Sequence, residues 1–377
     1  MERVAWARAH MPLLRELEAE LARTRPFAGM TIGICLHVEP KTAVLATALA
    51  QGGASVAITG SPGTTQNDVA DWLASQGFEV HGRREDGLLE HRQNLSRVME
   101  RRPELLLDNG ADLVSLLLEQ GGKAIGATEE TTTGANRLRE ELPGRVSFPV
   151  IVINDSPLKS IVENQHGVGQ TVTSSFLHAT NLGVAGRRFA VLGFGWCGRG
   201  IARSLSALGG RVAVVEPDSI RALEAALEGF DVSSLEEAIP RSEVFITATG
   251  RPGVLRREHF ELLPEGAVLA NSGHFSTEIE LDALRAASRE TARVDGGIER
   301  FTLASGKTIY LLARGEMLNL AAGGGNPVEV MDLGLSLQAA SLARIASAPS
   351  TLAAGPQPVP ADINQAVARR MLAALRQ

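Results

Sequence analysis

Residues 191–200 read Val-Leu-Gly-Phe-Gly-Trp-Cys-Gly-Arg-Gly. Three glycines of this stretch have the G-x-G-x-x-G spacing, and they are Gly193, Gly195 and Gly198. The apolar run Phe189–Leu192 precedes them and predicts a buried strand. Glycines at this spacing allow a tight turn, close approach of the backbone to a pyrophosphate, and close packing of a helix on a strand. The stretch therefore predicts a dinucleotide-binding fold.

The residues that follow strengthen this prediction. Arg199–Leu208 has a helical pattern, and Arg211–Val215 is a second apolar run that ends at Glu216. A carboxylate at that place binds the two ribose hydroxyls of NAD and repels the 2′-phosphate of NADP. Arg221, in the next helical stretch, either accepts such a phosphate or lies on the helix surface. We therefore expect NAD as the cofactor.

Length and composition exclude several classes of protein. A chain of 377 residues is too long for one ordinary core and predicts two domains. The net charge of −6 and the lack of a basic tract argue against nucleic acid as a partner. The two cysteines, Cys35 and Cys197, indicate neither a disulfide framework nor a metal site. The sequence has no signal-peptide core and no apolar run of membrane-spanning length, so we expect a soluble cytoplasmic protein without a membrane partner.

Apolar runs alternate with helical stretches such as Lys41–Gln51 and Thr65–Gln76. We expect the other strands at Thr31–Cys35, Ser55–Ile58, Glu79–His81, Glu104–Leu107, Ala124–Ile125, Phe148–Ile153, Val244–Gly250, Ala267–His274 and Thr308–Leu312. This alternation predicts an α/β fold with two Rossmann-like domains, whose parallel sheets are flanked by helices. The stretch Ala346–Pro360 is rich in Pro, Ala and Ser and predicts a linker, and Ala361–Leu375 predicts a final helix.

Two segments place unusual polarity inside apolar surroundings. The first is Glu129–Gly134, which reads Glu-Glu-Thr-Thr-Thr-Gly, and the second is Asn154–Asn164. Lys159 and Glu163 of the second segment would share one face of a helix. Ordinary structural roles are the alternatives, because a Lys/Glu pair is often a solvated surface pair and threonines often cap helices.

Together with the glycine fingerprint, these segments resemble the S-adenosylhomocysteine hydrolase (adenosylhomocysteinase) family. The matching stretches, in family order, are Gly33–His37, Thr65-Gln66, Glu129–Gly134, Asn154–Ser156 with Lys159, Gly193–Gly198, Asn271–Phe275 and Leu318–Ala321. The resemblance implies a substrate domain at residues 1–165, completed by 327–350, and an NAD-binding domain at 166–326, with 351–377 as linker and C-terminal helix. It also implies a nucleoside substrate, a homodimer or homotetramer, and one tightly bound NAD in each protomer.

The family's chemistry implies roles for individual residues. Bound NAD oxidises the nucleoside 3′-hydroxyl, the 5′ group is eliminated, water adds, and the ketone is reduced again. Lys159 and Glu163 would handle the hydroxyl proton, Glu130 would hold the ribose hydroxyls, and His37 and His274 would serve the 5′ end. The expected cofactor contacts are Thr131, Thr132, Thr133, Asn164, Gly193, Gly195, Trp196, Cys197, Gly198, Glu216, Arg221, Thr249, Gly250, Ser272, Gly273, His274 and Asn319.

This chain departs from the family pattern at a few of these positions. The family's second Asp in Asp-Asp-Gly-Gly-Asp is Asn109 here, and an amide cannot relay a proton. The Asp that partners the family's lysine is Glu163 here. The family's Thr and Glu that contact adenine are Glu39 and Lys41, which reverses one charge, and the His over the base is Asn326. Together with Thr65 and Gln66, these are the expected substrate contacts.

Three functions remain open from the sequence. The sugar site and the NAD site are kept while the base site is changed. This pattern favours an enzyme that oxidises the 3′-hydroxyl of a non-standard nucleoside and promotes loss of water or another 5′ group, acting as a lyase or dehydratase in nucleoside biosynthesis. The first alternative is an ordinary adenosylhomocysteinase that releases homocysteine and adenosine. The second is a catalytically silent, NAD-binding regulatory paralogue.

Overall fold

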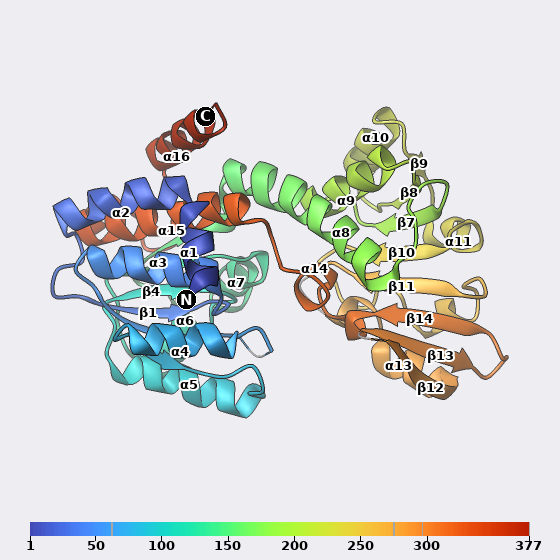
Figure 1. Ribbon diagram of the computed structural model, residues 1–377, viewed down its shortest axis with the longest axis horizontal. Helices are drawn as coiled ribbons and strands as arrows, with labels where there is room; N and C mark the ends of the chain where they lie inside the picture. The colour runs from blue at the N-terminus through green and yellow to red at the C-terminus, as the bar shows by residue number, and fades with distance from the viewer. Residues whose placement is uncertain (62, 274–275, 296, 377) are drawn as a thin grey trace. The chain divides into compact units, whose positions relative to one another are not determined.

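The computed structural model describes residues 1–61, 63–273, 276–295 and 297–376 (Figure 1). Contacts within the chain divide it into two compact units. The first unit combines Met1–Ser160 with Val328–Gln377, and the second is Ile161–Pro327. The stretch 351–377, expected as a separate linker and helix, is thus part of the first unit. None of the helices in the described ranges has both the length and the apolar character needed to cross a bilayer.

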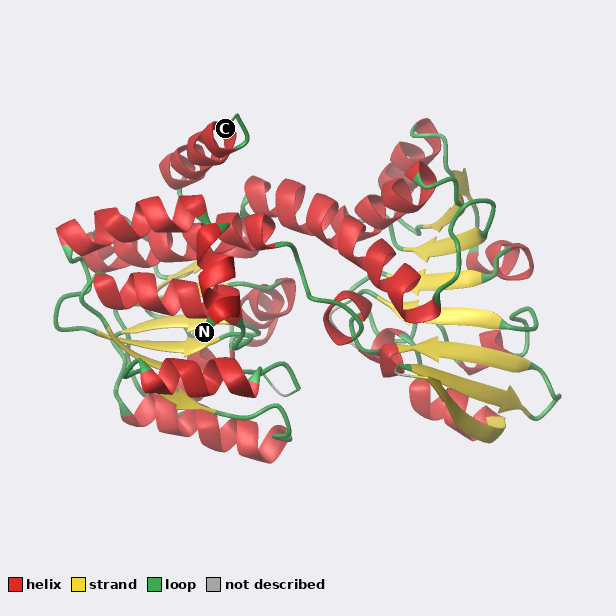
Figure 2. Cartoon of the chain, viewed as in Figure 1, coloured by secondary structure: helices red, strands yellow, loops and turns green. Residues whose placement is uncertain are grey.

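The first unit contains a parallel sheet of seven strands in the order β15-β6-β5-β4-β1-β2-β3. Helices cover both of its faces (Figure 2). Its central strands are buried along their length, which explains their continuous apolar runs. The strands are β1 (Thr31–Cys35), β2 (Ser55–Thr59), β3 (Glu79–His81), β4 (Leu105–Asp108), β5 (Gly126–Glu129), β6 (Pro149–Val152) and β15 (Gly355–Pro358). The helices are α1 (Glu2–Ala9), α2 (Pro12–Thr24), α3 (Pro40–Gln51), α4 (Asn67–Ser75), α5 (Leu88–Glu100), α6 (Asp112–Glu119), α7 (Thr132–Asn136), α15 (Val328–Ser347) and α16 (Ala361–Ala374).

Helix α15 joins the C-terminal part of the chain to the first unit. It packs against α2, α3 and β5. The buried carboxylate of Asp332 accepts hydrogen bonds from the backbone N–H groups of Leu13 (2.9 Å) and Leu14 (2.8 Å). These amides belong to the first turn of α2, whose own N-cap residue offers no side-chain bond. A residue from the end of the chain therefore caps a helix near its beginning.

The second unit contains an eight-stranded sheet in the order β12-β13-β14-β11-β10-β7-β8-β9. Six strands, from β14 to β9, are parallel, and β13 and β12 extend the sheet in antiparallel fashion. The order outward from β7 is that of a dinucleotide-binding fold. The strands are β7 (Arg188–Leu192), β8 (Arg211–Val215), β9 (Asp231–Val232), β10 (Val244–Thr247), β11 (Ala267–Asn271), β12 (Ser288–Asp295), β13 (Ile298–Leu303) and β14 (Thr308–Leu312). The helices are α8 (Val168–Thr180), α9 (Trp196–Ala207), α10 (Ser219–Leu227), α11 (Leu235–Ala238), α12 (Arg257–Phe260), α13 (Leu281–Ala287) and α14 (Leu318–Ala321).

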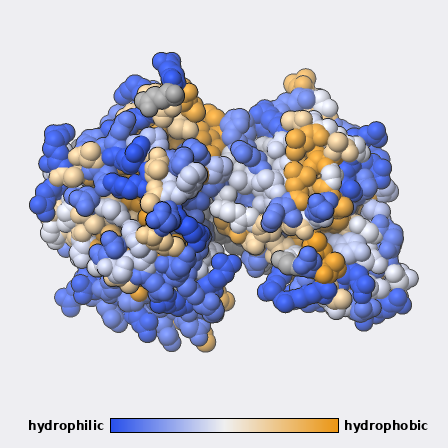
Figure 3. Space-filling model, in the orientation of Figure 1, coloured by the Kyte–Doolittle hydropathy of each residue, from blue (hydrophilic) through white to orange (hydrophobic). Residues whose placement is uncertain are grey.

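The surfaces of the two units differ in polarity. Hydrophilic side chains cover most of the displayed face of the first unit, whereas apolar side chains gather on part of the displayed face of the second (Figure 3). Among the exposed apolar residues of the second unit, Ile220, Leu223 and Leu227 all belong to α10.

Two predicted elements are wrong in detail. The strand expected at Ala124–Ile125 begins at Gly126, because Ile125 still belongs to the approach to the sheet, and it continues through the polar side chains of Thr128 and Glu129. The linker expected at 346–360 contains β15, which pairs with β6. Its prolines hide the strand in the sequence, but an edge strand tolerates proline because one side of it needs no partner.

Candidate active site

The carboxyl end of the first unit's sheet is the natural place for a ligand. The strand order reverses between β4 and β1, so the loops that follow these two strands lead away in opposite directions and leave a crevice. His37 follows β1 and Asn109 follows β4. The structure brings them together, with 3.5 Å between Asn109 Nδ2 and His37 Nε2. The predicted neighbourhood of these two residues is therefore present.

A buried ion pair lies over β5 and β6, on one side of that crevice. The Lys159 ammonium donates to the carboxylate oxygen Oε1 of Glu130 and also to the Glu130 backbone carbonyl, at 2.7 Å for the latter. The two side chains are only 4% and 8% exposed. Gln338 of α15 donates through Nε2 to the other Glu130 oxygen, Oε2. Sequence reasoning found Lys159 and Glu130 but missed Gln338.

The altered base-recognition residues form a second buried ion pair, over β1. Lys41 Nζ lies 3.0 Å from Glu39 Oε2, with both residues at the start of α3. Burial raises the pKa of Glu39, and the adjacent Lys41 ammonium opposes that rise. Thr65 is buried, and Gln66 is fixed beside this segment by a bond from its N–H to the Val38 carbonyl (2.8 Å). The predicted base contacts therefore lie on neighbouring loops.

The loops over β4 and β5 are held in place by Glu129, which the sequence grouped with the reactive residues. Its fully buried carboxylate accepts from the backbone N–H groups of Gly110 (3.0 Å), Ala111 (2.8 Å) and Thr131 (2.7 Å). A Cβ on Gly134 would lie 2.2 Å from this carboxyl group, so only glycine fits there. Burial and the neighbouring Asp108 carboxyl raise the pKa of Glu129. Glu129 is therefore a scaffold for the loops, whereas Glu130 faces the lysine.

The threonine run that follows has mixed roles. Thr131 caps α7, because its hydroxyl accepts from the Gly134 N–H at 3.0 Å, as the structural alternative predicted. The Thr132 hydroxyl accepts from Asn154 Nδ2 at 2.9 Å. Thr133 is half-buried. Cofactor contact by these three residues remains a prediction.

The chain passes from the first unit to the second within the π-helix η3 (Lys159–Gly167). The sequence predicts an ordinary helix here, and the wider π turn is the difference. Such turns are frequent at functional sites because they change the aim of the side chains. Glu163 is buried and Asn164 is half-buried on this segment.

The glycine fingerprint of the second unit fits NAD. Gly193 has φ +102°, and a Cβ on Gly198 would lie 1.9 Å from the Gly193 carbonyl oxygen, so both positions require glycine. A Cβ on Gly195, at the N-terminus of α9, would meet no atom within 4 Å, which leaves space for a pyrophosphate. Glu216 is fixed at the end of β8 by the N–H groups of Phe194 (2.7 Å) and Asp218 (3.0 Å). The turn, the space and the carboxylate are those that a dinucleotide needs.

Residues beside the fingerprint vary in exposure. Trp196 is 43% exposed, and Cys197 is half-buried. The Arg199 guanidinium stacks over the rings of Phe194 and Trp196 at 5.5 and 5.0 Å from their centroids. Arg221 is exposed on the first turn of α10, which agrees with its surface interpretation.

A buried carboxylate that the sequence did not single out supports two further cofactor loops. Glu278 accepts from the backbone N–H groups of Thr249 (3.0 Å) and Gly250 (2.7 Å). A Cβ on Gly273 would lie 1.5 Å from Glu278 Oε1, so this glycine allows the carboxylate to reach the Thr249 turn. Ser272 is buried at the end of β11. His274, predicted as catalytic and as a cofactor contact, lies outside the described residues.

An amide network links three predicted residues of the second unit. Asn326 donates from Nδ2 to Glu163 Oε1 at 3.4 Å, and its Oδ1 lies 3.5 Å from Asn319 Nδ2. The Thr171 hydroxyl lies 3.4 Å from both Asn326 Oδ1 and Asn319 Nδ2. Asn326, predicted to contact the base, and Asn319, predicted to contact NAD, are therefore coupled through hydrogen bonds.

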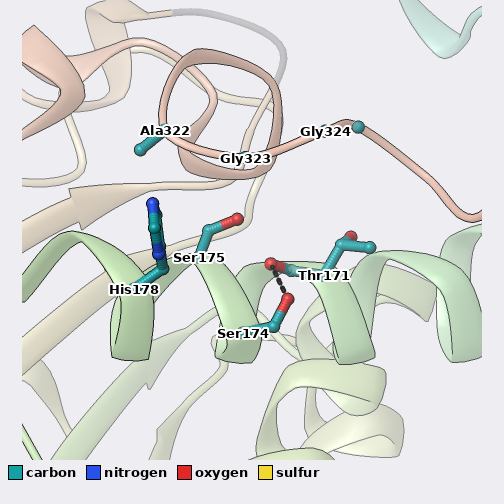
Figure 4. A pocket seen from close by; sticks show the side chains of 8 residues that line it. Thr171, Ser174, Ser175, His178, Ala322, Gly323 and Gly324 are labelled. Carbon is teal, nitrogen blue, oxygen red and sulfur yellow. Dashed lines mark hydrogen bonds between the residues drawn. The ribbon is translucent and has the colours of Figure 1, made fainter. Parts of the chain in front are cut away.

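A polar cavity of about 440 Å³ adjoins this network (Figure 4). One side is a stripe of α8 side chains, comprising Thr171, Ser174, Ser175 and His178, which face the glycine-rich segment 322–325. The stripe has the i, i+3, i+4, i+7 spacing that usually holds apolar side chains. The cavity therefore has a hydroxyl-lined wall.

One group of metal-ligand type is present in the first unit. Cys35, His91 and Asp112 place one ligand atom each within 4.8 Å of the others. The two ring nitrogens of His91 already lie 3.1 Å from the Gly60 carbonyl and from Asp112 Oδ2, and Arg137 donates to Asp112 Oδ1. Burial, with the nearby carboxyl groups, raises the pKa of the Cys35 thiol. Internal hydrogen bonds thus account for the histidine and the aspartate without a metal.

Comparison with known proteins gives the family. The profile described as S-adenosyl-L-homocysteine hydrolase matches residues 1–125, and the one described as S-adenosyl-L-homocysteine hydrolase, NAD binding domain matches residues 164–325. An S-inosyl-L-homocysteine hydrolase of Methanopyrus kandleri is 41% identical over 376 residues, covering 98% of this chain and 89% of the relative. An adenosylhomocysteinase of Thermotoga maritima is 40% identical over 379 residues, covering 99% and 94%.

A solved structure supports the fold alone. The dipicolinate synthase of Bacillus halodurans superposes with a TM-score of 0.53 at 13% identity, covering 85% of this chain and 99% of that one. The second unit is thus an NAD-binding domain of Rossmann type, and NAD is the cofactor. By the matched profiles and the full-length relatives, the chain belongs to the S-adenosyl-L-homocysteine hydrolase family.

Proposed function

We propose that this protein hydrolyses the thioether of an S-nucleosyl-L-homocysteine to a nucleoside and L-homocysteine. The observation that supports this best is the buried Lys159–Glu130 pair at the carboxyl edge of the first sheet. Homologues named for hydrolysis of S-inosyl- and S-adenosylhomocysteine match nearly the whole chain. The ordinary hydrolase cycle, which the sequence left as an alternative, therefore becomes the main proposal.

The residues of the first unit divide the reaction between them. When bound, NAD supplies reversible oxidation of the sugar 3′-hydroxyl, which makes the hydrogen on C4′ acidic. The Glu130 carboxylate accepts hydrogen bonds from the ribose hydroxyls. Lys159 Nζ, held beside it, exchanges the proton of the 3′-hydroxyl. Burial of both groups excludes water from this proton transfer.

His37 acts at the 5′ end of the nucleoside. Elimination breaks the C4′–H and C5′–S bonds and leaves a C4′=C5′ alkene, to which water adds before the ketone is reduced. The sulfur needs a proton as it leaves, and the water must lose one as it adds. Asn109 cannot ionise, so it positions the His37 ring from 3.5 Å while the imidazole exchanges both protons.

The Glu39–Lys41 pair favours a 6-oxopurine base over adenine. Hypoxanthine presents an acceptor at O6 and a donor at N1–H, whereas adenine presents a donor at N6 and an acceptor at N1. The Lys41 ammonium donates hydrogen bonds only, and a Glu39 carboxylate accepts them only. Their 3.0 Å separation sets a donor beside an acceptor, which complements O6 and N1–H. S-inosyl-L-homocysteine is therefore the substrate we propose.

A second candidate function rests on Asn109. A site without a carboxylate at this position has one fewer group to activate water, which favours a cycle that stops after loss of the 5′ group. Mass spectrometry of reactions with S-inosylhomocysteine separates the two proposals. Hydrolysis yields inosine and homocysteine in equal amounts, and the partial cycle yields a 4′,5′-unsaturated nucleoside.

A further inference from the structure

The Glu130 carboxylate is held from two sides. Lys159 donates to Oε1, and Gln338 donates through Nε2 to Oε2. Lys159 lies at the end of the loop after β6, whereas Gln338 lies on α15, in the segment that returns to the first unit after the NAD-binding domain. Two donors on different oxygens fix the plane of a carboxylate, whereas one donor leaves it free to rotate about its last bond. The orientation of Glu130 therefore depends on Gln338.

The placement of the Gln338 amide is otherwise unfavourable. The residue is fully buried, and among the described residues its Oε1 has no hydrogen-bond partner. An unpaired buried carbonyl destabilises a fold, and methionine of similar size would avoid that penalty. Helix α15 is otherwise apolar where it contacts β5 and α3. The bond from Nε2 to Glu130 is thus what the amide contributes.

We propose that Gln338 is a positioning residue for the sugar site, holding Glu130 in the orientation in which it receives the ribose hydroxyls. It touches neither substrate nor cofactor in this role and acts through Glu130. This inference rests on the proposed function of the Glu130–Lys159 pair. It adds to that site a residue supplied by α15, so the sugar site is completed only when the chain has returned from the second unit.

The test compares Gln338→Met with Gln338→Glu in the NAD-loaded enzyme. Gln338→Met keeps the volume and removes the donor, so kcat/KM for S-inosylhomocysteine should fall about 10- to 100-fold, as expected for one hydrogen bond to a charged group. The loss of a donor also makes the carboxylate easier to protonate, so the acid limb of the kcat/KM profile should move to higher pH. Gln338→Glu, which adds a second carboxylate, should move that limb further.

A matched control is Ser341→Ala, which removes another fully buried polar group of α15. It should leave both the rate and the pH profile unchanged. If Gln338→Met lowers thermal stability but keeps the wild-type kcat/KM and acid limb, its role is structural and the inference is overturned.

A second measurement needs no substrate. The Glu130 carboxyl resonance, assigned with Glu130→Gln, can be titrated by ¹³C NMR in the NAD-loaded enzyme, and in Gln338→Met it should titrate at higher pH. An unmoved titration also overturns the inference. If wild-type enzyme releases no homocysteine but this titration moves, the proposed function fails while the positioning contact stands.

Discussion

Replacing Lys41 with methionine tests how the base is read. The substitution keeps the length of the side chain and removes the ammonium that lies 3.0 Å from Glu39 in a buried position. A hydrogen bond from a charged group contributes about 1.5–3 kcal/mol. Because about 1.4 kcal/mol corresponds to a tenfold ratio, kcat/KM for S-inosylhomocysteine should fall about 10- to 150-fold. The value for S-adenosylhomocysteine should stay level or rise, because the 6-amino group cannot accept from an ammonium.

The assay measures homocysteine thiol released from each substrate under identical conditions. Lys41→Met leaves the Glu39 carboxyl without its cation, so the fold also loses stability. The double variant Glu39→Gln/Lys41→Met removes both charges and should recover much of that stability without recovering the preference for inosine. Lys123→Met, at an exposed lysine, is the matched control and should behave as wild type. Equal losses on both substrates would refute this account of base recognition.

Three further outcomes follow from the packing. Gly134→Ala drives a Cβ to 2.2 Å from a buried carboxyl group and should lower the free energy of unfolding by about 1–3 kcal/mol in denaturant titrations, whereas Gly183→Ala, which meets no atom within 4 Å, should change it little. Gly198→Ala places a Cβ 1.9 Å from a backbone carbonyl, so the purified variant should contain far less NAD by absorbance and mass spectrometry, and full occupancy would contradict the fingerprint assignment. Burial raises the pKa of Asp332 to about 6 from 3.8, so the folded state retains this proton and the free energy of unfolding should fall by up to about 3 kcal/mol between pH 4 and 6; in Asp332→Asn this contribution is absent, and an unchanged pH slope would contradict it.

The sequence predicts much of the sheet framework because its strands are buried on both faces. Such strands are continuous apolar runs, and Arg211–Val215 and Thr308–Leu312 have the predicted bounds. The fingerprint is equally local, since Gly193 and Gly198 are required by contacts within one strand–helix turn. The edge strand β15 escaped prediction because its prolines are typical of a linker, and only pairing with β6 reveals it.

The site could be predicted where roles depend on residue type, but not where they depend on distant contacts. Glu129 and Glu130 are neighbours of the same type, yet one is enclosed by backbone N–H groups and the other by Lys159. Gln338 reaches Glu130 across 208 positions of the chain, a separation that no local pattern can signal. Glu278 is a similar case, because its role appears only when the Thr249 turn folds against it.

The central claim is tested most directly by one measurement: homocysteine thiol released when the purified, NAD-loaded protein is mixed with S-inosyl-L-homocysteine. The account predicts thiol and inosine in a 1:1 ratio, faster than thiol release from S-adenosyl-L-homocysteine, and loss of both products in Lys159→Met. Absence of thiol from both substrates, or its release at an unchanged rate in Lys159→Met, would contradict the account.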